Sequence, residues 1–119
     1  MFETEKPKRY DLEERAFQFA KDVRVFINKI PRTIASIEDG KQLVRSSGSV
    51  GANYIEANEP LSSKDFRMRI KICRKEAKES IYWLKLIDVP EVMNERRVCF
   101  INEATELMKI FSAIMRKHE

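Results

Sequence analysis

Apolar residues recur at spacings of three and four through four long segments of the chain, and few residues interrupt the pattern. Only three glycines and four prolines occur among the 119 residues. A sheet protein needs a turn after every short strand, whereas long helices need few turns. We therefore expect an all-α protein with one domain, spanning residues 1–119, around a single core.

Residues that start and end helices separate these segments. Asp11, with Glu14 three positions later, predicts the start of the first helix, and Pro31 predicts its end. Ser62 and Asp65 form a similar start for the third helix. The later connections are short, so neighbouring helices should run in opposite directions. The predicted fold is an antiparallel up-down-up-down four-helix bundle with helices at about 11–30, 36–58, 63–87 and 94–116.

The same spacing predicts which side chains face the core. In the first helix these are Leu12, Ala16, Phe19, Ala20, Val23, Phe26, Ile27 and Ile30. In the second they are Leu43, Ser47, Val50, Tyr54 and Ala57. In the third they are Phe66, Ile70, Cys73, Ala77, Ser80 (or Ile81) and Leu84, and in the fourth Val98, Ile101, Thr105, Met108, Phe111 (or Ile110) and Met115.

The chain lacks the residue sets that most enzymes and metal sites require. Its one histidine, His118, lies next to the C-terminus and is expected to be solvated, so there is no Ser-His-Asp or Cys-His set. Phosphate-cradling glycine motifs are missing, as are the Glu-x-x-His pairs of di-iron bundles. We therefore predict a non-enzymatic protein with no catalytic residues, no metal and no cofactor.

The N-terminal residues MFETEKPKRYD are charged and contain no apolar stretch of the kind found in signal peptides. No run approaches the length of about 20 apolar residues that crosses a bilayer. We expect a cytoplasmic protein without membrane contact, in which Cys73 and Cys99 are reduced thiols. A net charge of +4 and a pI of about 9.1 are compatible with an acidic partner such as nucleic acid.

A cationic ridge follows one face of the third predicted helix. At about 100° per residue its members fall within one sector of roughly 100°, beside the core stripe, with Glu76 and Glu79 elsewhere. The functional interpretation is a surface that contacts phosphates of RNA or DNA. The structural alternative is a solvated face paired with acidic residues of a neighbouring helix. The ridge consists of Lys64, Arg67, Lys71, Arg74, Lys75, Lys78 and Lys85.

The second helix carries two further faces beside its core stripe. Val44, Gly48, Gly51 and Ile55 form an apolar face on which another backbone could approach closely, and each interior glycine costs roughly 1 kcal/mol relative to alanine. A helix with two apolar faces indicates a homo-oligomer. The third face, a polar stripe, is interpreted as hydrogen-bonded contacts that fix register, with a binding site as the alternative. The stripe consists of Gln42, Arg45, Ser49, Asn53 and Glu56.

Two apolar residues of the third helix also favour self-association. Ile72 and Trp83 lie well away from its core stripe, and tryptophan is enriched at protein interfaces.

Three segments, in order and over nearly the whole chain, resemble one known family. They are YDLEERAFQFAKDVRVFI, QLVRSSGSVGANYIEA and SSKDFRMRIKICRKEAKESIYWLKLI. The family is that of the 23S rRNA intervening-sequence proteins, small bacterial four-helix bundles also called the ribosomal protein S23 family. The resemblance implies a ring-shaped homopentamer without established catalytic residues, and it maps Gln42, Arg45, Ser49, Asn53 and Glu56 to the family signature without assigning them a role.

The resemblance also implies candidate functions. The first-known members were encoded inside intervening sequences of 23S rRNA genes. Distant relatives are accessory subunits of diversity-generating retroelements that bind nucleic acid and a reverse transcriptase through a positively charged pentamer. The leading hypothesis is a homopentameric bundle that binds RNA or DNA through its basic face. The alternatives are a scaffold that docks a partner enzyme, and a small-molecule binder that uses the stripe from Arg45 to Glu56.

Overall fold

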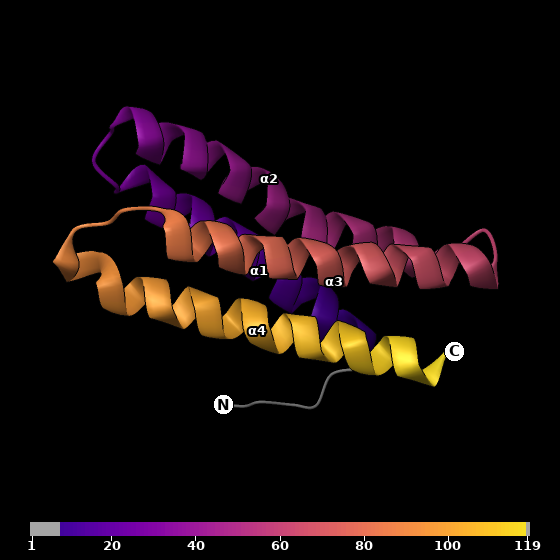
Figure 1. The fold of residues 1–119 in the computed structure, drawn as a ribbon. Helices are drawn as coiled ribbons and strands as arrows, with labels where there is room; N and C mark the ends of the chain where they lie inside the picture. Colours follow the sequence, from indigo (N-terminus) through magenta and orange to yellow (C-terminus); the bar gives the residue numbers. More distant parts are fainter. Residues whose placement is uncertain (1–7, 119) are drawn as a thin grey trace.

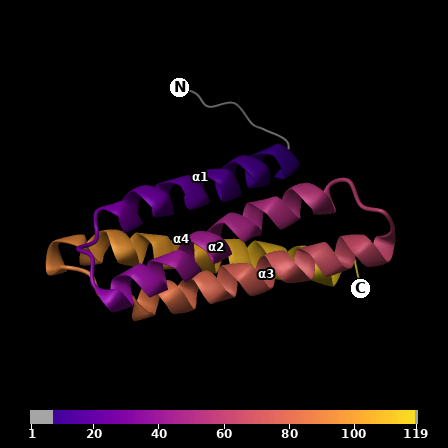
Figure 2. The ribbon, with the colours of Figure 1, turned by 90° about the horizontal axis from the view of Figure 1, so that it is seen from above.

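The computed structural model describes the backbone of residues 8–118 and the side chains from Leu12 to His118, so the charged segment 1–7 lies outside the described residues. It contains α1 (Lys8–Asn28), α2 (Ile34–Ala57), α3 (Ser63–Leu86), the short 3₁₀ helix η1 (Glu91–Met93) and α4 (Asn94–Lys117). Consecutive α-helices run in opposite directions (Figures 1 and 2). The predicted all-α bundle of four helices is confirmed.

The helices do not contribute equally to the bundle. α3 packs extensively against both α2 and α4, whereas α1 packs against α2 and, to a smaller extent, against α4. Figure 2 shows α1 lying along one edge of the molecule, on the far side of α2 from α3. One face of α3 is therefore left facing solvent.

Local capping explains where α2 and α3 begin. Ser62 Oγ accepts a hydrogen bond from the Asp65 backbone N–H at 3.0 Å, as the sequence predicts. α2 begins at Ile34 because Thr33 and Ser36 form a reciprocal capping box, with N···O distances of 3.0 and 2.9 Å. α1 begins at Lys8, so the prediction that Asp11 starts this helix is wrong: Asp11 lies inside it.

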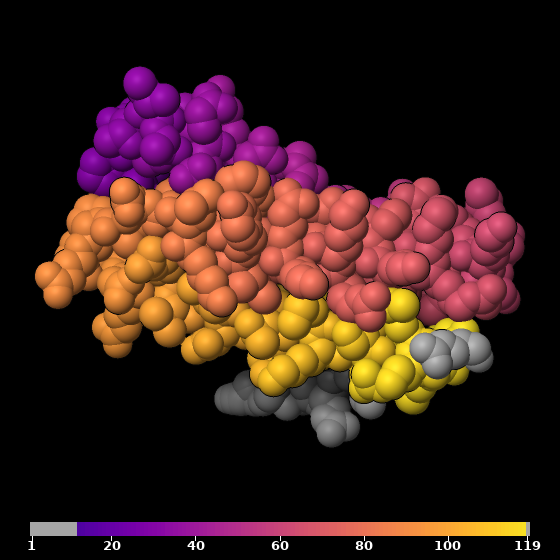
Figure 3. All heavy atoms as spheres, viewed as in Figure 1, coloured from indigo at the N-terminus to yellow at the C-terminus, as the bar shows by residue number. Residues whose placement is uncertain are grey.

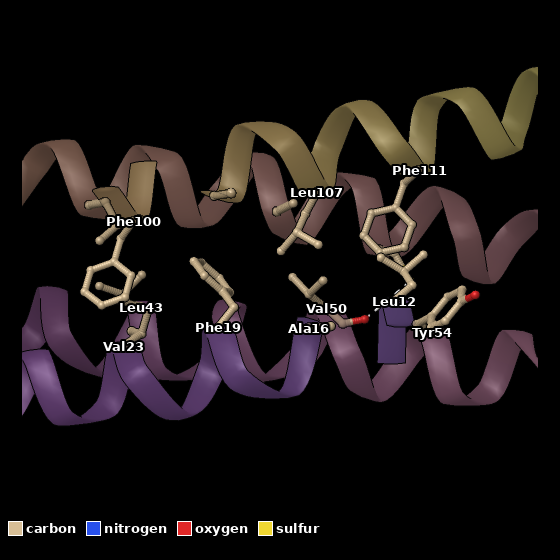
Figure 4. Packing of buried hydrophobic residues seen from close by; sticks show 14 of the residues in the cluster. Leu12, Ala16, Phe19, Val23, Leu43, Val50, Tyr54, Phe100, Leu107 and Phe111 are labelled. Carbon is tan, nitrogen blue, oxygen red and sulfur yellow. Dashed lines mark hydrogen bonds between the residues drawn. The ribbon is translucent and has the colours of Figure 1, made fainter. Parts of the chain in front are cut away.

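The core lies along the bundle axis, and most of its predicted members are buried. All five predicted core residues of α2 are buried, as are Ile70, Cys73, Ala77, Ser80 and Leu84 of α3. Side chains of α1 and α2 point toward those of α4 (Figure 4). Phe100 contacts Phe19 and Phe26 edge to face, with ring centroids 6.3 and 5.2 Å away.

The predicted inward face of α4 is confirmed at Phe111 but is wrong by about one position over the preceding turns. Phe100, Ala104, Leu107 and Phe111 are buried, whereas Val98 is 45% exposed. The predicted residues Ile101, Thr105 and Met108 are only partly buried. Both stripes obey the three-and-four spacing, because α4 is apolar over a broad arc. Packing against the neighbouring helices therefore selects between two stripes that spacing alone treats as equal.

Small residues bring α2 and α3 close together in the core. Ser46 Oγ lies 2.8 Å from Ser80 Oγ, and Ser80 donates to the Glu76 carbonyl at 2.9 Å, which leaves Ser46 as the donor within the pair. Cys73 Sγ donates to the Val50 carbonyl at 3.4 Å, and burial raises the pKa of this thiol to about 12. Cys73 is therefore a packed, unreactive thiol, whereas Cys99 is exposed.

Candidate nucleic-acid interface

The cationic ridge occupies the face of α3 that no other helix covers. Six of its seven members are exposed, and Arg74 is half-buried. α3 crosses the front of the molecule between α2 and α4 in Figure 3. Lys64 and Lys85 stand 21 residues apart on one straight helix, so the ridge is about 32 Å long. It is therefore a continuous, solvent-facing line of positive charge.

The ridge cations form no close ion pairs with described carboxylates, although Lys75 acts on Glu79 at longer range. Among the described side chains, none of its seven cations lies within 4.0 Å of an Asp or Glu oxygen. The structural alternative requires acidic residues from an adjacent helix, and α2 and α4 place none at that distance. The same chain does pair cations elsewhere, as Arg15 of α1 does with Glu103 of α4 at 2.7 Å.

The other polar flank of α3 forms a cluster of ion pairs and hydrogen bonds with α2, which we call the polar seam. It consists of Arg45, Glu76, Glu79 and Trp83, together with Ser49, Asn53, Asp65 and Arg69.

In the first half of the polar seam, Arg45 joins two carboxylates of α3. Its Nη1 lies 3.3 Å from both oxygens of Glu76, which is buried, and its Nη2 donates to Glu79. Glu79 also accepts a hydrogen bond from Trp83 Nε1 at 3.0 Å. The Trp83 N–H, followed by the Arg45 guanidinium, lowers the pKa of Glu79. The hydrogen bonds that Arg45 donates to Glu76 and Glu79 raise its own pKa.

The second half of the polar seam lies nearer the start of α3. Asn53 donates to the backbone carbonyl and the hydroxyl of Ser49, at 2.9 and 3.0 Å, and accepts from Arg69 Nη1 at 3.2 Å. Arg69 in turn approaches Asp65 at 3.7 Å. Side chains from two helices thus hold one another in a fixed register. Sequence reasoning missed Arg69 because its partner Asn53 lies on another helix.

The structure brings only the middle of the predicted polar stripe into contact. Arg45, Ser49 and Asn53 belong to the polar seam, whereas Gln42 and Glu56 are exposed. The neighbouring side chains of α3 occupy the space beside Arg45 and Asn53, which argues against a concave pocket for a small molecule there. The register that these residues fix is between two helices of one chain.

The apolar face of α2 is partly covered by α1, with more room at Gly51 than at Gly48. A Cβ on Gly51 would lie 3.4 Å from Ala16 Cβ, an ordinary contact. A Cβ on Gly48 would lie 3.0 Å from the end of the flexible Arg24 side chain. A methyl group therefore fits within the chain at Gly51, whereas at Gly48 the Arg24 side chain would have to move. Between α1 and α2 a groove of about 490 Å³ stays open, with Phe17 and Ile55 on its rim, 58% and 56% exposed.

Ile72 and Trp83 have different surroundings, and neither is fully exposed. Trp83 packs against the core cluster and donates to Glu79, so it serves the fold of the single chain. Ile72 lines a shallow groove of about 610 Å³ that also includes the ridge residues Lys71, Arg74, Lys75 and Lys78. Met68 of α3 and Met108 and Ser112 of α4 complete its lining.

Aromatic rings stand at both ends of the ridge. In the sequence Tyr82 is the one aromatic residue that stands out beside the ridge, which by itself argues against a base-stacking platform, but the contact between Phe66 and His118 is not visible there. Phe66 and His118 are in ring contact, with centroids 4.8 Å apart, and they line a pocket of about 400 Å³ together with Arg67. Near the other end, Tyr82 is 57% exposed, and its ring contacts that of Trp83 at 5.0 Å. His118 follows the end of α4 rather than lying on the helix of the ridge, so no helical wheel could place it there.

The described residues were also compared with what a metal site and a membrane-spanning helix require. No group of three or more His, Cys, Asp or Glu side chains comes together in a way that could hold a metal ion. None of the described helices combines the length and the apolar character needed to cross a membrane.

Comparisons with known proteins place the chain in one family. Residues 8–113 match the sequence profile of the 23S rRNA-intervening sequence protein family. None of the curated proteins matches the chain. A crystal structure of a protein of unknown function, from the S23 ribosomal protein family of Bacteroides thetaiotaomicron VPI-5482, superposes with a TM-score of 0.77 at 27% identity and covers 92% of this chain and 99% of its own. The chain therefore belongs to the family of 23S rRNA-intervening sequence proteins.

Proposed function

We propose that this protein is a cytoplasmic, non-enzymatic homo-oligomer that binds RNA or DNA through the cationic ridge of α3. The observation that carries the proposal is the contrast within α3. The cations of the polar seam are matched by carboxylates, whereas the seven ridge cations are exposed and have no carboxylate within 4.0 Å among the described side chains.

The chemistry of the ridge fits a polyanion. Like charges on one helix face repel one another mildly, so the ridge is not explained by the stability of the helix. A polynucleotide neutralises such a line of cations and releases its condensed counterions, which favours binding. Lysine predominates in the ridge, and lysine contacts phosphate as a point charge rather than as a planar fork. We therefore expect contacts to the phosphate backbone rather than readout of base edges.

Charge reversal at three ridge positions tests the proposal. Arg67→Glu, Lys71→Glu and Lys78→Glu together should abolish binding to a labelled structured RNA, measured by fluorescence anisotropy. The matched control reverses Lys29, Lys41 and Lys109, which are exposed outside α3, and it changes the net charge by the same amount. The control should retain binding. Equal affinity of the ridge variant and the unaltered protein would refute a role for the ridge.

The homo-oligomer is supported by apolar surface that one chain leaves uncovered. Phe17 and Ile55 are more than half exposed on the groove between α1 and α2. Gly51 also lines this groove, although packing within the chain leaves room for a Cβ there. A second copy packed there would explain both features. Light scattering should give a mass of about five times the 14.0 kDa of one chain if the assembly is the pentamer expected from the family resemblance. A mass of 14.0 kDa would refute self-association.

A scaffold that docks a partner enzyme is the second candidate function. Met68, Ile72 and Met108 add apolar surface beside the ridge cations, and an acidic amphipathic helix would complement such a surface. Purification of the tagged protein from its native cells, with and without nuclease treatment, distinguishes the two. A stoichiometric partner that survives nuclease and is lost in the ridge variant favours the scaffold.

A further inference from the structure

We propose that the polynucleotide on the ridge is unpaired, with bases lying against the rings at the two ends and against the apolar groove between them. This inference rests on the proposed function and narrows it to single strands. Ridge cations alone do not distinguish a duplex from a single strand, because both present phosphates. The side chains that accompany the cations do distinguish them.

The first base site is the pocket beside Arg67. Phe66 and His118 stand with ring centroids 4.8 Å apart and a tilt of 58°, and they line about 400 Å³ together with Pro60, Ser62, Ser63 and Arg67. This volume is in the range of pockets that hold small planar ligands, roughly 300–1,000 Å³. Arg67 is exposed next to the rings, so a phosphate and its base can be held at adjacent points.

The second base site is Tyr82. At 100° per residue, Tyr82 falls about 40° from Lys78 and about 60° from Lys85, so it shares the sector of the ridge. Its side chain is 57% exposed, and the edge-to-face contact with Trp83, at an interplanar angle of 79°, holds the ring in place. An exposed ring between two lysines is a platform on which any base can stack.

Between the two sites, the groove of about 610 Å³ mixes charge with apolar surface. Lys71, Arg74, Lys75 and Lys78 line it together with Met68, Ile72 and Met108. The base pairs of a duplex are stacked inside, so a duplex would cover this apolar surface with phosphates and sugars and leave the rings unused. An unpaired strand places bases on these surfaces and phosphates on the cations at the same time.

Fluorescence anisotropy with matched probes tests the proposal. The probes are labelled RNA and DNA oligonucleotides of about 16 nucleotides without self-complementarity, near the upper site size of one single-strand-binding module, and the duplex of each with its complement. All titrations use one salt concentration, since affinity depends on it. Either single strand should bind more tightly than its duplex, and the tighter of the two identifies the polynucleotide.

Ring-deleting variants with matched controls locate the bases. Tyr82→Ala and His118→Ala should each weaken single-strand binding by about 5- to 150-fold, the usual range for losing one stacked base. Both side chains are exposed, so neither substitution should unfold the protein. Tyr82→Phe and His118→Phe retain an aromatic ring and should stay within about twofold of the unaltered protein. Duplex affinity should change little in any of the four.

The possible results separate this inference from the function on which it rests. If the ridge charge reversal leaves all binding intact, the proposed function itself fails. If that reversal removes binding but duplexes bind as tightly as single strands, the single-strand inference is overturned and the proposed function stands. Tyr82→Ala and His118→Ala proteins with unchanged single-strand affinity overturn it as well. Losses confined to single strands and to the alanine variants support it.

Discussion

The polar seam and the cationic ridge lie on one helix and treat charge in opposite ways. On the flank that meets α2, Arg45 spans Glu76 and Glu79, and Arg69 joins Asn53 to Asp65. On the solvent face of α3, the seven ridge cations have no carboxylate within 4.0 Å among the described side chains. Charged side chains between two helices find their partners within the chain. The exposed cations of the ridge can find theirs on another molecule.

This difference separates the charged residues of the protein into those that stabilise the fold and those available for binding. Substitutions in the polar seam should change the free energy of unfolding and leave polynucleotide binding almost unchanged. Substitutions in the ridge should do the reverse. A variant that changes both properties strongly would show that the two regions are not independent.

The largest expected effect concerns salt and the ridge. If most of the seven ridge cations contact phosphates, raising salt from about 50 to 200 mM should weaken polynucleotide binding by roughly three orders of magnitude. Each ridge lysine that is neutralised, as in Lys78→Gln, should reduce the slope of log affinity against log salt by about 0.7 to 1. Lys41→Gln, on α2, should leave the slope unchanged. A flat salt dependence would contradict phosphate contact altogether.

The next effect is on stability and comes from the polar seam. Arg45→Ala leaves the buried Glu76 carboxylate without its cation, so unfolding in urea should become easier by about 1–3 kcal/mol. Lys71→Ala, on the ridge, should stay within about 0.5 kcal/mol of the unaltered protein. Glu76→Gln added to Arg45→Ala should recover part of the loss, because the unpaired charge is then removed. Equal losses in Arg45→Ala and Lys71→Ala would contradict the distinction.

Spacing along the sequence predicts most of the fold and the position of the ridge, but not the pairs of the polar seam. It places the ridge, because all seven cations lie on a single helix and share one sector. It does not reveal the pairs Arg45–Glu76 and Asn53–Arg69, because each joins residues of different helices. The first turns of the inward face of α4 are mispredicted for a related reason: two stripes obey the same spacing, and only packing buries Phe100 rather than Val98.

A smaller effect is expected at Gly51, and it separates folding from assembly. Alanine is favoured over glycine in a helix by up to about 1 kcal/mol, and a Cβ there would make an ordinary contact with Ala16. Gly51→Ala should therefore raise the urea midpoint slightly. If another copy packs against α2 at this position, the same variant should lower the assembly mass in light scattering. If Gly51→Ala instead lowers the urea midpoint of the monomer, α1 and α2 must pack more closely at this position than the contact with Ala16 indicates.

The smallest effect is the contribution of Glu79 to the pH dependence of stability. The Trp83 N–H and the Arg45 guanidinium lower the pKa of Glu79 below its ordinary value of 4.5. Between the two values the unfolded chain binds more protons than the folded one, so stability rises with pH there. The contribution is present in full above about pH 4.5 and is lost as pH falls through the lowered pKa.

Urea unfolding at a series of pH values between about 3 and 6 measures this contribution, which should stay below about 1 kcal/mol because Glu79 is partly exposed. Glu79→Gln should flatten the curve over this interval. Trp83→Phe keeps the ring but removes the N–H donor, so it should flatten the curve in part. Polynucleotide binding by both variants should remain unaltered, since Glu79 faces α2 rather than the ridge. Identical pH curves for Glu79→Gln and the unaltered protein would show that the polar seam fixes helix register without contributing this proton linkage.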